Sequence, residues 1–265
     1  MEAGVVELGF YQMLSAYIFV IILLLIVKVK QIPREKEIIL STIRMTIQLM
    51  LMGYVLIFIF DNQHPLLTLF VILVMETFAV INIFSRAKKK LSLYFKKIIA
   101  FSMVFGTLIT LFYFIFIVIN VTPWYDPRYF VTIAGMLIGN SMTGITLGVE
   151  RMSDGMETEK ETVEGYLMLG ARPNVAAKRI INNSFESAII PTINNMMGMG
   201  IIFLPGMMTG QILSGISPLT AISYQIAIML GILGGVSLTV ITFVQLGYKT
   251  FFNEKNQLIN DTGDY

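Results

Sequence analysis

The sequence predicts an all-α polytopic membrane protein with seven transmembrane helices, and three observations lead to that prediction. Apolar residues make up 55% of the 265-residue chain and charged residues only 14%, which leaves too little polar surface for a soluble globular protein. Long apolar runs recur along the chain, most of them about 20 residues long, the length that a helix needs to cross the hydrocarbon core. Basic residues gather on alternate loops between these runs, which is typical of a multi-pass protein.

The seven predicted spans belong to a single domain that covers the whole chain. Each begins and ends where polar or turn-forming residues interrupt an apolar run. The spans are residues 8–27, 38–60, 66–84, 98–119, 129–149, 188–204 and 219–246.

The distribution of Lys and Arg predicts the orientation of the chain. Apart from Arg44 and Arg128, every basic residue falls in loops 28–36, 86–97 and 150–187 or in the C-terminal tail. Loops rich in Lys and Arg stay in the cytoplasm. We therefore expect the N-terminus outside, the C-terminus in the cytoplasm and residues 150–187 on the cytoplasmic side.

Residues 150–187 form the one long hydrophilic stretch between apolar runs. Asp154 followed by Glu157 predicts a helix start near Asp154, because acidic side chains favour the first turn of a helix. Gly170 suits the end of a helix, and Pro173 suits the first turn of the next one. The stretch is therefore predicted to be a helix, a sharp turn and a second helix, on which a soluble partner could dock. An ordinary solvated loop is the alternative, because charged runs are often no more than solvated faces.

Glycines four residues apart recur in the second half of the chain. Such pairs let helix backbones approach closely in a membrane. The pairs are Gly135 with Gly139, Gly144 with Gly148, Gly206 with Gly210, and Gly231 with Gly235. We expect the last three spans to form a tight inner bundle.

The predicted sixth span is short, carries Pro191 and ends before Pro205, so it is broken by Pro and Gly. A broken span exposes backbone groups that must line a cavity or pack against protein, so it indicates a translocation path. The polar and thioether side chains of this region, with those of the preceding span and a mid-span carboxylate, are the predicted lining. They are Glu76, Asn140, Ser141, Thr143, Asn194, Asn195, Met196, Met197, Met207, Met208 and Gln211.

Glu76 is the one carboxylate near the middle of a predicted span. Ionisable groups at such depth are costly and usually functional. Glu76 could hold a metal ion together with Met196, or it could relay protons. A structural ion pair with Arg44 on the preceding span is the alternative. Methionine in a membrane helix is more often adaptable packing than a metal ligand, and packing is the alternative for Met196.

The run E-G-Y-L-M-L-G-A-R-P at residues 164–173 resembles the EAA signature of ABC transporter permeases, in which Glu is followed six residues later by Gly. Residues 135–229 as a whole resemble the FetB-type permeases of the iron-export ABC transporter family, which is related to the plant aluminium-tolerance permeases. Gly165 and Tyr166 replace the two alanines of the general signature. The resemblance assigns coupling to an ATPase to Glu164, Leu169, Gly170, Ala171, Arg172 and Pro173.

This resemblance implies a permease subunit that works as a homodimer in the cell membrane, in contact with lipid and not with nucleic acid. The sequence contains no G-x-x-x-x-G-K-[ST] loop, so ATP and Mg would be bound by a separate cytoplasmic ATPase and not by this chain. We expect a non-enzymatic exporter subunit for iron or another metal cation. An ion-coupled carrier or channel that uses Glu76, and an ABC permease for a nucleotide sugar, are the alternatives.

Overall fold

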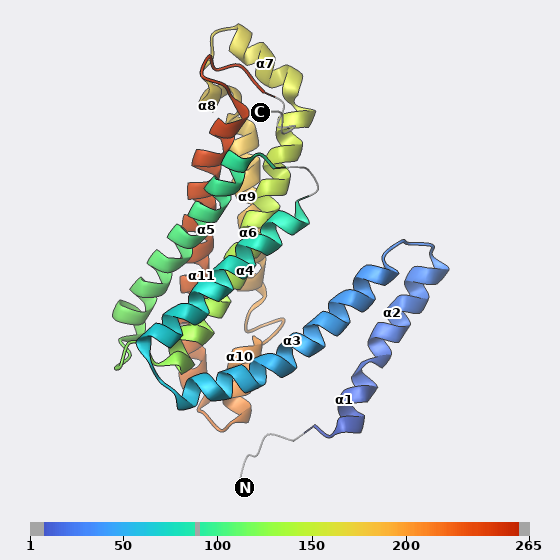
Figure 1. Ribbon diagram of the computed structural model, residues 1–265, viewed down its shortest axis with the longest axis vertical. Coiled ribbons are helices and arrows are strands. Elements are labelled where there is room, and N and C mark those ends of the chain that lie inside the picture. Colours follow the sequence, from blue (N-terminus) through green and yellow to red (C-terminus); the bar gives the residue numbers. More distant parts are fainter. Residues whose placement is uncertain (1–7, 88–90, 260–265) are drawn as a thin grey trace.

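The computed structural model describes residues 8–87 and 91–259, and these residues fold as helices joined by short connections. Figure 1 shows a long bundle with a separate helical hairpin at its side. The helices are α1 Phe10–Ala16, α2 Ile18–Val29, α3 Glu35–Asp61, α4 Pro65–Arg86, α5 Leu93–Tyr113, α6 Pro127–Thr158, α7 Lys160–Met168, α8 Pro173–Ala176, α9 Lys178–Gly198, α10 Gly206–Leu213 and α11 Pro218–Gly247. A π-helical turn, η1 Phe114–Ile119, continues α5, and a 3-10 turn, η2 Tyr248–Phe251, continues α11.

Six helical stretches in the described ranges are long and apolar enough to cross a membrane, which confirms an all-helical polytopic fold. They correspond to every predicted span except 188–204. In that region α9 begins at Lys178, within the hydrophilic stretch, and ends at Gly198. The predicted break is present at residues 199–205, which end at Pro205, whereas α9 continues through Pro191 without interruption.

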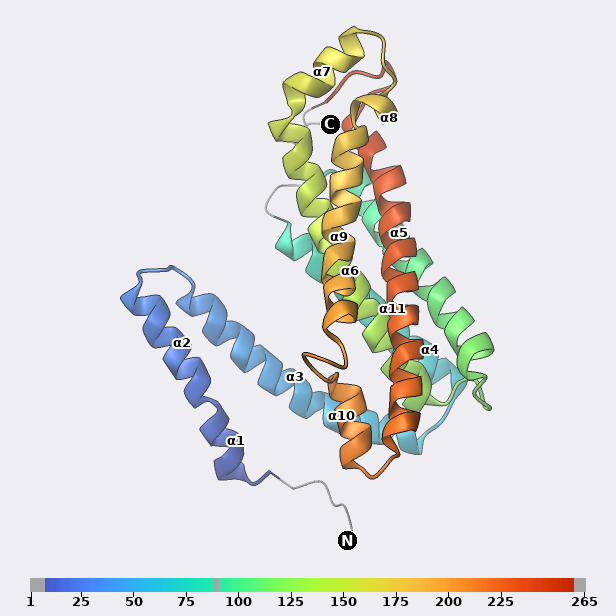
Figure 2. The same cartoon turned by 180° about the vertical axis from the view of Figure 1, so that it is seen from behind.

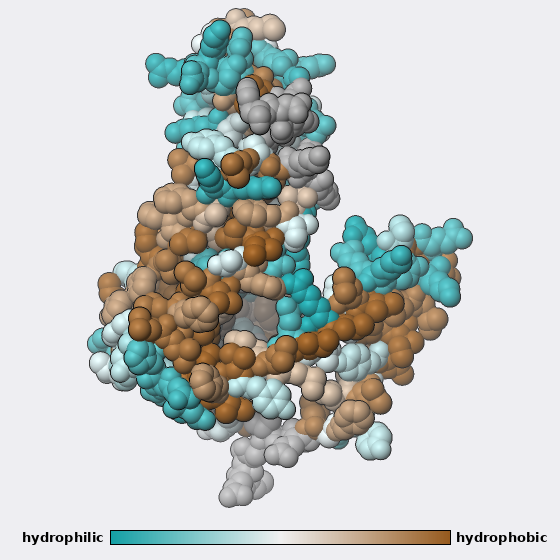
Figure 3. All heavy atoms as spheres, in the orientation of Figure 1, coloured by the Kyte–Doolittle hydropathy of each residue, from teal (hydrophilic) through white to brown (hydrophobic). Residues whose placement is uncertain are grey.

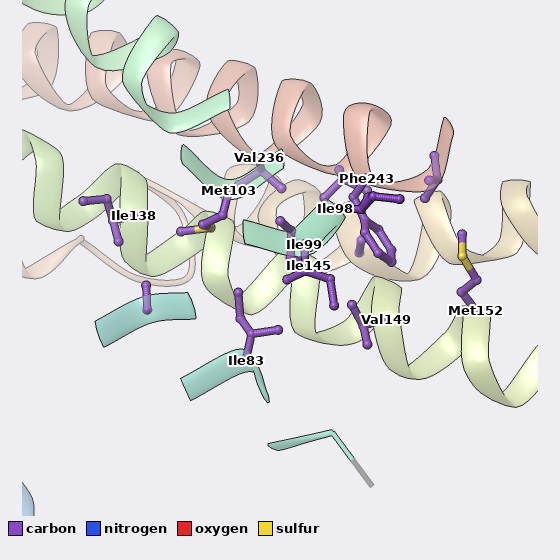
Figure 4. Close-up of a cluster of buried hydrophobic side chains, with 14 of the residues drawn as sticks. Ile83, Ile98, Ile99, Met103, Ile138, Ile145, Val149, Met152, Val236 and Phe243 are labelled. Atoms are coloured by element: carbon purple, nitrogen blue, oxygen red, sulfur yellow. The ribbon is translucent and has the colours of Figure 1, made fainter. Parts of the chain in front are cut away.

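The expected tight bundle of the last three spans is present. Helices α6, α9 and α11 pack against one another, α5 lies along α11, and α4 lies along α6. Figures 1 and 2 show these helices side by side from both directions. Their apolar side chains interdigitate in the core, where Met103, Ile145 and Val236 from three different helices lie close together (Figure 4).

Glycine allows the closest helix crossings in this bundle. A Cβ added at Gly106 would lie 2.6 Å from the Cα of Thr239, so α5 and α11 approach almost backbone to backbone. In two of the predicted glycine pairs one member lies in a tight contact: an added Cβ would lie 2.9 Å from Val236 at Gly144 and 2.8 Å from Phe114 at Gly231, whereas the contacts at Gly148 and Gly235 are ordinary ones of 3.5 Å. In pair 135/139 an added Cβ at Gly135 would lie 3.3 Å from the Met75 side chain, and Gly139, Gly206 and Gly210 have no atom within 4 Å.

Helices α1, α2 and α3 form a hairpin that stands away from the bundle (Figures 1 and 2). Tyr17 and Thr46 join its two arms through a hydrogen bond of 2.6 Å between their hydroxyls. Few side chains link it to the bundle: the Arg44 guanidinium lies 5.1 Å from the ring centroid of Phe78. The hairpin therefore presents most of its apolar surface outward, as helices in contact with lipid do.

Candidate functional site

The hydrophilic stretch begins as a continuation of a membrane helix. The predicted helix start near Asp154 is wrong, because α6 runs unbroken from Pro127 to Thr158. The reason is packing: Gly155 faces Ile180 of α9, with an added Cβ only 2.8 Å from the Ile180 Cγ2. The polar sequence therefore still carries a buried face, and this face overrides the local capping signal.

The chain first bends at Glu159, between α6 and α7. Arg179 of α9 donates from Nε to the Glu159 Oε2 at 3.0 Å, and its Nη2 forms an ion pair with the same oxygen at 2.8 Å. A hydrogen bond between charged groups is stronger than one between neutral groups. Helix α7 is thereby attached at its base to both α6 and α9.

The predicted turn at Gly170 is confirmed. Gly170 has φ +86°, its N–H donates to the carbonyl of Leu167 at 2.9 Å, and the Ala171 N–H donates to the carbonyl of Tyr166 at 3.0 Å. These two bonds form the Schellman arrangement that ends a helix on a left-handed residue. Pro173 is the first residue of α8, also as predicted.

Helices α7 and α8 form a hairpin around the Gly170 turn. The end of this α7–α8 hairpin carries an apolar tip, which we define as Tyr166, Met168, Leu169 and Val175. Met168 and Leu169 are each 86% exposed, although they lie at the most hydrophilic end of the molecule (Figure 3). Glu164 lies below the tip and forms an ion pair of 3.8 Å with Lys160. An exposed apolar cluster rimmed by charges is typical of a protein docking surface.

The other face of the α7–α8 hairpin is buried. Val163 of α7 is 1% exposed, and Ala176 and Ala177 are buried beside it. These residues join the apolar core that continues down through Met152 and Met156 of α6. A load applied to the apolar tip would therefore reach the membrane helices through packed side chains.

Glu76 lies inside the bundle, between α4 and α5. It is 5% exposed, and its Oε1 accepts a hydrogen bond from the Thr107 hydroxyl, while Oε2 has no hydrogen-bond partner. Arg44 stacks on Phe78 instead, and no ion pair connects it to Glu76 in the described ranges. Thr107 was not among the predicted residues, because a threonine within an apolar run gives no signal of its partner on another helix.

The predicted path residues of α6 and α9 lie away from Glu76, on another side of the bundle. Gly148 faces Ala188 and Gly155 faces Ile180, so the antiparallel register places Asn140 level with Asn194 and Asn195. Thr143, Asn194 and Asn195 are exposed, and the Asn140 amide donates to the Met136 carbonyl at 2.8 Å. Figure 3 shows hydrophilic surface on the side of the bundle that faces α3.

The remaining predicted path residues are divided between core and surface. Ser141 is fully buried, 3.5 Å from the Thr239 hydroxyl. Met208 is buried, Met196 and Met207 are partly buried, and Met197 is 75% exposed. Gln211 has a buried Oε1 without a partner. The described residues contain no group of three or more His, Cys, Asp or Glu that could hold a metal ion, and Glu76 and Met196 stay a predicted metal pair.

Irregular backbone follows α9 where the predicted path was placed. The segment 199–205 folds back on itself: Gly200, with φ +83°, donates its N–H to the Phe203 carbonyl at 2.9 Å, and Ile202 donates to the Gly198 carbonyl at 2.9 Å. Such internal bonds satisfy part of the backbone that a broken helix leaves open.

Comparison with known proteins places the chain in a family. The family described as Uncharacterised protein family (UPF0014) matches residues 10–252. The chain belongs to the UPF0014 family. It is 33% identical over 245 residues to "UPF0014 membrane protein YjkA" of Bacillus subtilis (strain 168), covering 91% of this chain and 94% of the relative. No solved structure is significantly similar to it.

Two further UPF0014 relatives have names that refer to a biological role. "Probable iron export permease protein FetB" of Escherichia coli (strain K12) is 32% identical over 244 residues, 92% of each chain. "Protein ALUMINUM SENSITIVE 3" of Arabidopsis thaliana is 33% identical over 245 residues, 92% of this chain and 88% of the relative. With six apolar helices in the described ranges, this UPF0014 chain is a multi-pass membrane protein related to permeases, and it resembles the FetB-type family as the sequence predicts.

Proposed function

We propose that this UPF0014 chain is the transmembrane subunit of an ATP-driven ABC exporter in the plasma membrane. The observation that carries the proposal is the structure of the α7–α8 hairpin. Its apolar tip beside the Gly170 turn is exposed, and its opposite face packs onto the membrane helices. The chain has no P-loop sequence, so a cytoplasmic ATPase would bind ATP and Mg and dock on the tip. Closure of the ATPase pair would move α6 and α9 between inward-open and outward-open states.

The proposed topology has seven spans, with the N-terminus outside and the C-terminus in the cytoplasm. Helix α9 together with segment 199–205 and α10 would form the sixth span. In Figure 1 the α7–α8 hairpin and the end of α11 lie at the top, opposite the start of α1, and the α2–α3 turn is the upper end of its own hairpin, which supports this topology. A reporter fused after residue 160 should read as cytoplasmic, and one after residue 63 as external. The opposite result at either site would contradict the proposed topology.

A homodimer is proposed because of the polar surface on α6 and α9. Asn194 and Asn195 lie on the surface of a segment at membrane depth, where unshielded amides cost several kcal/mol each by a rough estimate. A second copy packed against this face would cover them and enclose a shared path. Asn140 and Thr143 would line the same path from α6.

Iron or another metal cation is the proposed cargo. The name of the E. coli relative, iron export permease, supports this choice. Oxygen donors at Glu76 and along α6 and α9, with thioethers such as Met196, are ligands that a divalent transition metal accepts.

Reconstitution of the chain with a Walker-motif ATPase tests the proposal. ATP hydrolysis should rise with iron or a related metal ion and should not respond to nucleotide sugars, measured across a panel of both. Stimulation by a nucleotide sugar alone would overturn the cargo assignment. Transport driven by a proton gradient without any ATPase would overturn the ABC mechanism and favour a carrier based on Glu76.

A further inference from the structure

The segment that follows the central helix α11 extends towards the α7–α8 hairpin. We define residues 248–259, which include η2, as the C-terminal strap. Figures 1 and 2 both show it rising from the end of α11 to lie beside α7 and α8. Helix α11 packs against α5, α6, α9 and α10, so the strap leads from the α7–α8 hairpin to a central helix of the bundle.

The strap has a defined internal structure. The Asn253 side-chain oxygen accepts from the N–H groups of Lys255 at 3.0 Å and Gln257 at 2.9 Å. The Asn253 N–H donates to the Gln257 carbonyl at 2.9 Å, and the Ile259 N–H returns to the Phe251 carbonyl at 2.8 Å. An Asn that bonds the backbone two residues on stabilises a tight turn. The segment is thus a closed turn rather than a loose tail.

Apolar side chains fix the strap to the core beneath the hairpin. Phe251 is 4% exposed, and its ring lies 5.4 Å from that of Phe95, centroid to centroid. Phe252 and Leu258 pack against the same apolar core that contains Val163 of α7. The strap and α7 are therefore both anchored to this core, and Figures 1 and 2 show them next to each other at its end.

Helix α7 depends on such support. It has nine residues, and Val163 is its one fully buried side chain. A helix of this length is not stable on its own in water, so its position is set by what it packs against. We infer that the C-terminal strap is a positioning element that holds α7 at a fixed angle and links the apolar tip to α11.

This inference rests on the proposed coupling role of the hairpin and extends it. Without the strap, a load on the apolar tip would reach α6 and α9 through Glu159 and Gly155 but would bend α7 away from α11. With it, three of the bundle helices would move together. Leu258 and Phe252 are positioning residues in this scheme, because they act through α7 and contact neither ATP nor cargo.

The test uses the absence of cysteine from the sequence. Spin labels at Met168→Cys and Glu186→Cys, on the apolar tip and on the exposed face of α9, report the angle of α7 by pulsed EPR on the full-length chain. The parent should give one narrow distance peak. Leu258→Asp should lose that peak, and the matched Leu258→Met should keep it.

Asn253→Ala provides a second variant, since it removes the hydrogen bonds of the exposed turn without disturbing the core. If Leu258→Asp does not fold, Asn253→Ala alone tests the inference. A narrow peak unchanged in Asn253→Ala and in any folded Leu258→Asp would overturn the inference. The EPR measurement needs no ATPase, so its outcome is separate from that of the coupling role itself.

A functional readout accompanies the distances. In the reconstituted complex, the folded strap variants should retain ATP hydrolysis and association with the ATPase but lose transport. A loss of hydrolysis and association together with an unchanged EPR peak would contradict the positioning role.

Discussion

The inner bundle and the N-terminal hairpin are both built from apolar helices, yet they differ in how they pack. In the most apolar part of α1–α2, 6% of the residues are buried inside the structure, whereas 44% are buried in the most apolar part of α11. The bundle carries glycines at its crossings and buried hydroxyls such as Ser141 and Thr239. The hairpin has Gly53 with no atom within 4 Å of an added Cβ.

The difference teaches that hydropathy brings a helix into the membrane but does not decide what it packs against. Small residues and interhelical hydrogen bonds make that decision, because lipid is as apolar as the helices themselves. The α7–α8 hairpin extends the closely packed region and not the N-terminal one. Coupling is therefore expected to act on the bundle.

The largest effect is expected from filling the tightest crossing of the bundle. Gly106→Val would place side-chain atoms within about 3 Å of the Thr239 backbone, and overpacking of this severity costs roughly 3 kcal/mol or more. The matched change Gly53→Val in the N-terminal hairpin should change stability by less than about 1 kcal/mol and not lower it, because Val is a better helix former than Gly. Thermal unfolding of both variants in detergent measures the difference. Equal loss of stability would show that the two regions are packed alike.

Next in size is the effect of neutralising the buried carboxyl. Glu76→Gln keeps an oxygen that can accept from Thr107, so we expect normal folding and a severe loss of metal transport, with ATPase association intact. Transport assays on the purified complex, with Thr77→Ala on the exposed face of α4 as control, provide the measurement. Parent-like transport would remove Glu76 from the path.

A smaller effect is expected from reversing a charge below the apolar tip. Glu164→Arg loses an exposed ion pair with Lys160, which changes stability by less than about 1 kcal/mol. It should nevertheless weaken association with the ATPase. The exposed neighbour Glu161→Arg, outside the signature, is the control. Equal affinities of both variants in a titration of the ATPase would contradict a specific role of Glu164.

The smallest effect is expected at the contact between the N-terminal hairpin and the bundle. Arg44→Gln removes the contact with Phe78, which contributes about 0.5–1 kcal/mol for an exposed cation–π pair. Because no ion pair joins Arg44 to Glu76, the double variant with Glu76→Gln should be additive within about 0.5 kcal/mol. A rescue of stability in the double variant would instead reveal a coupled pair.

The sequence predicts the coupling hairpin better than the path. Gly170 and Pro173 act through local backbone rules, so the turn and the start of α8 are read directly from their neighbours. The start near Asp154 fails because packing of Gly155 on Ile180 is a contact between distant segments. For the same reason the sequence does not show that Glu76 is buried and Asn194 exposed. Both are polar residues at membrane depth, but their positions in the bundle depend on tertiary packing that no local pattern records.

The most direct measurement of the coupling role is ATP-driven transport by Gly170→Asp, compared with Gly165→Ala on the same helix. An Asp at φ +86° strains the turn by about 1 kcal/mol and places a charge beside the apolar tip. We predict that Gly170→Asp folds in the membrane but neither binds the ATPase nor transports, whereas Gly165→Ala does both. Normal transport by Gly170→Asp would contradict the assignment of residues 150–187 as the coupling site.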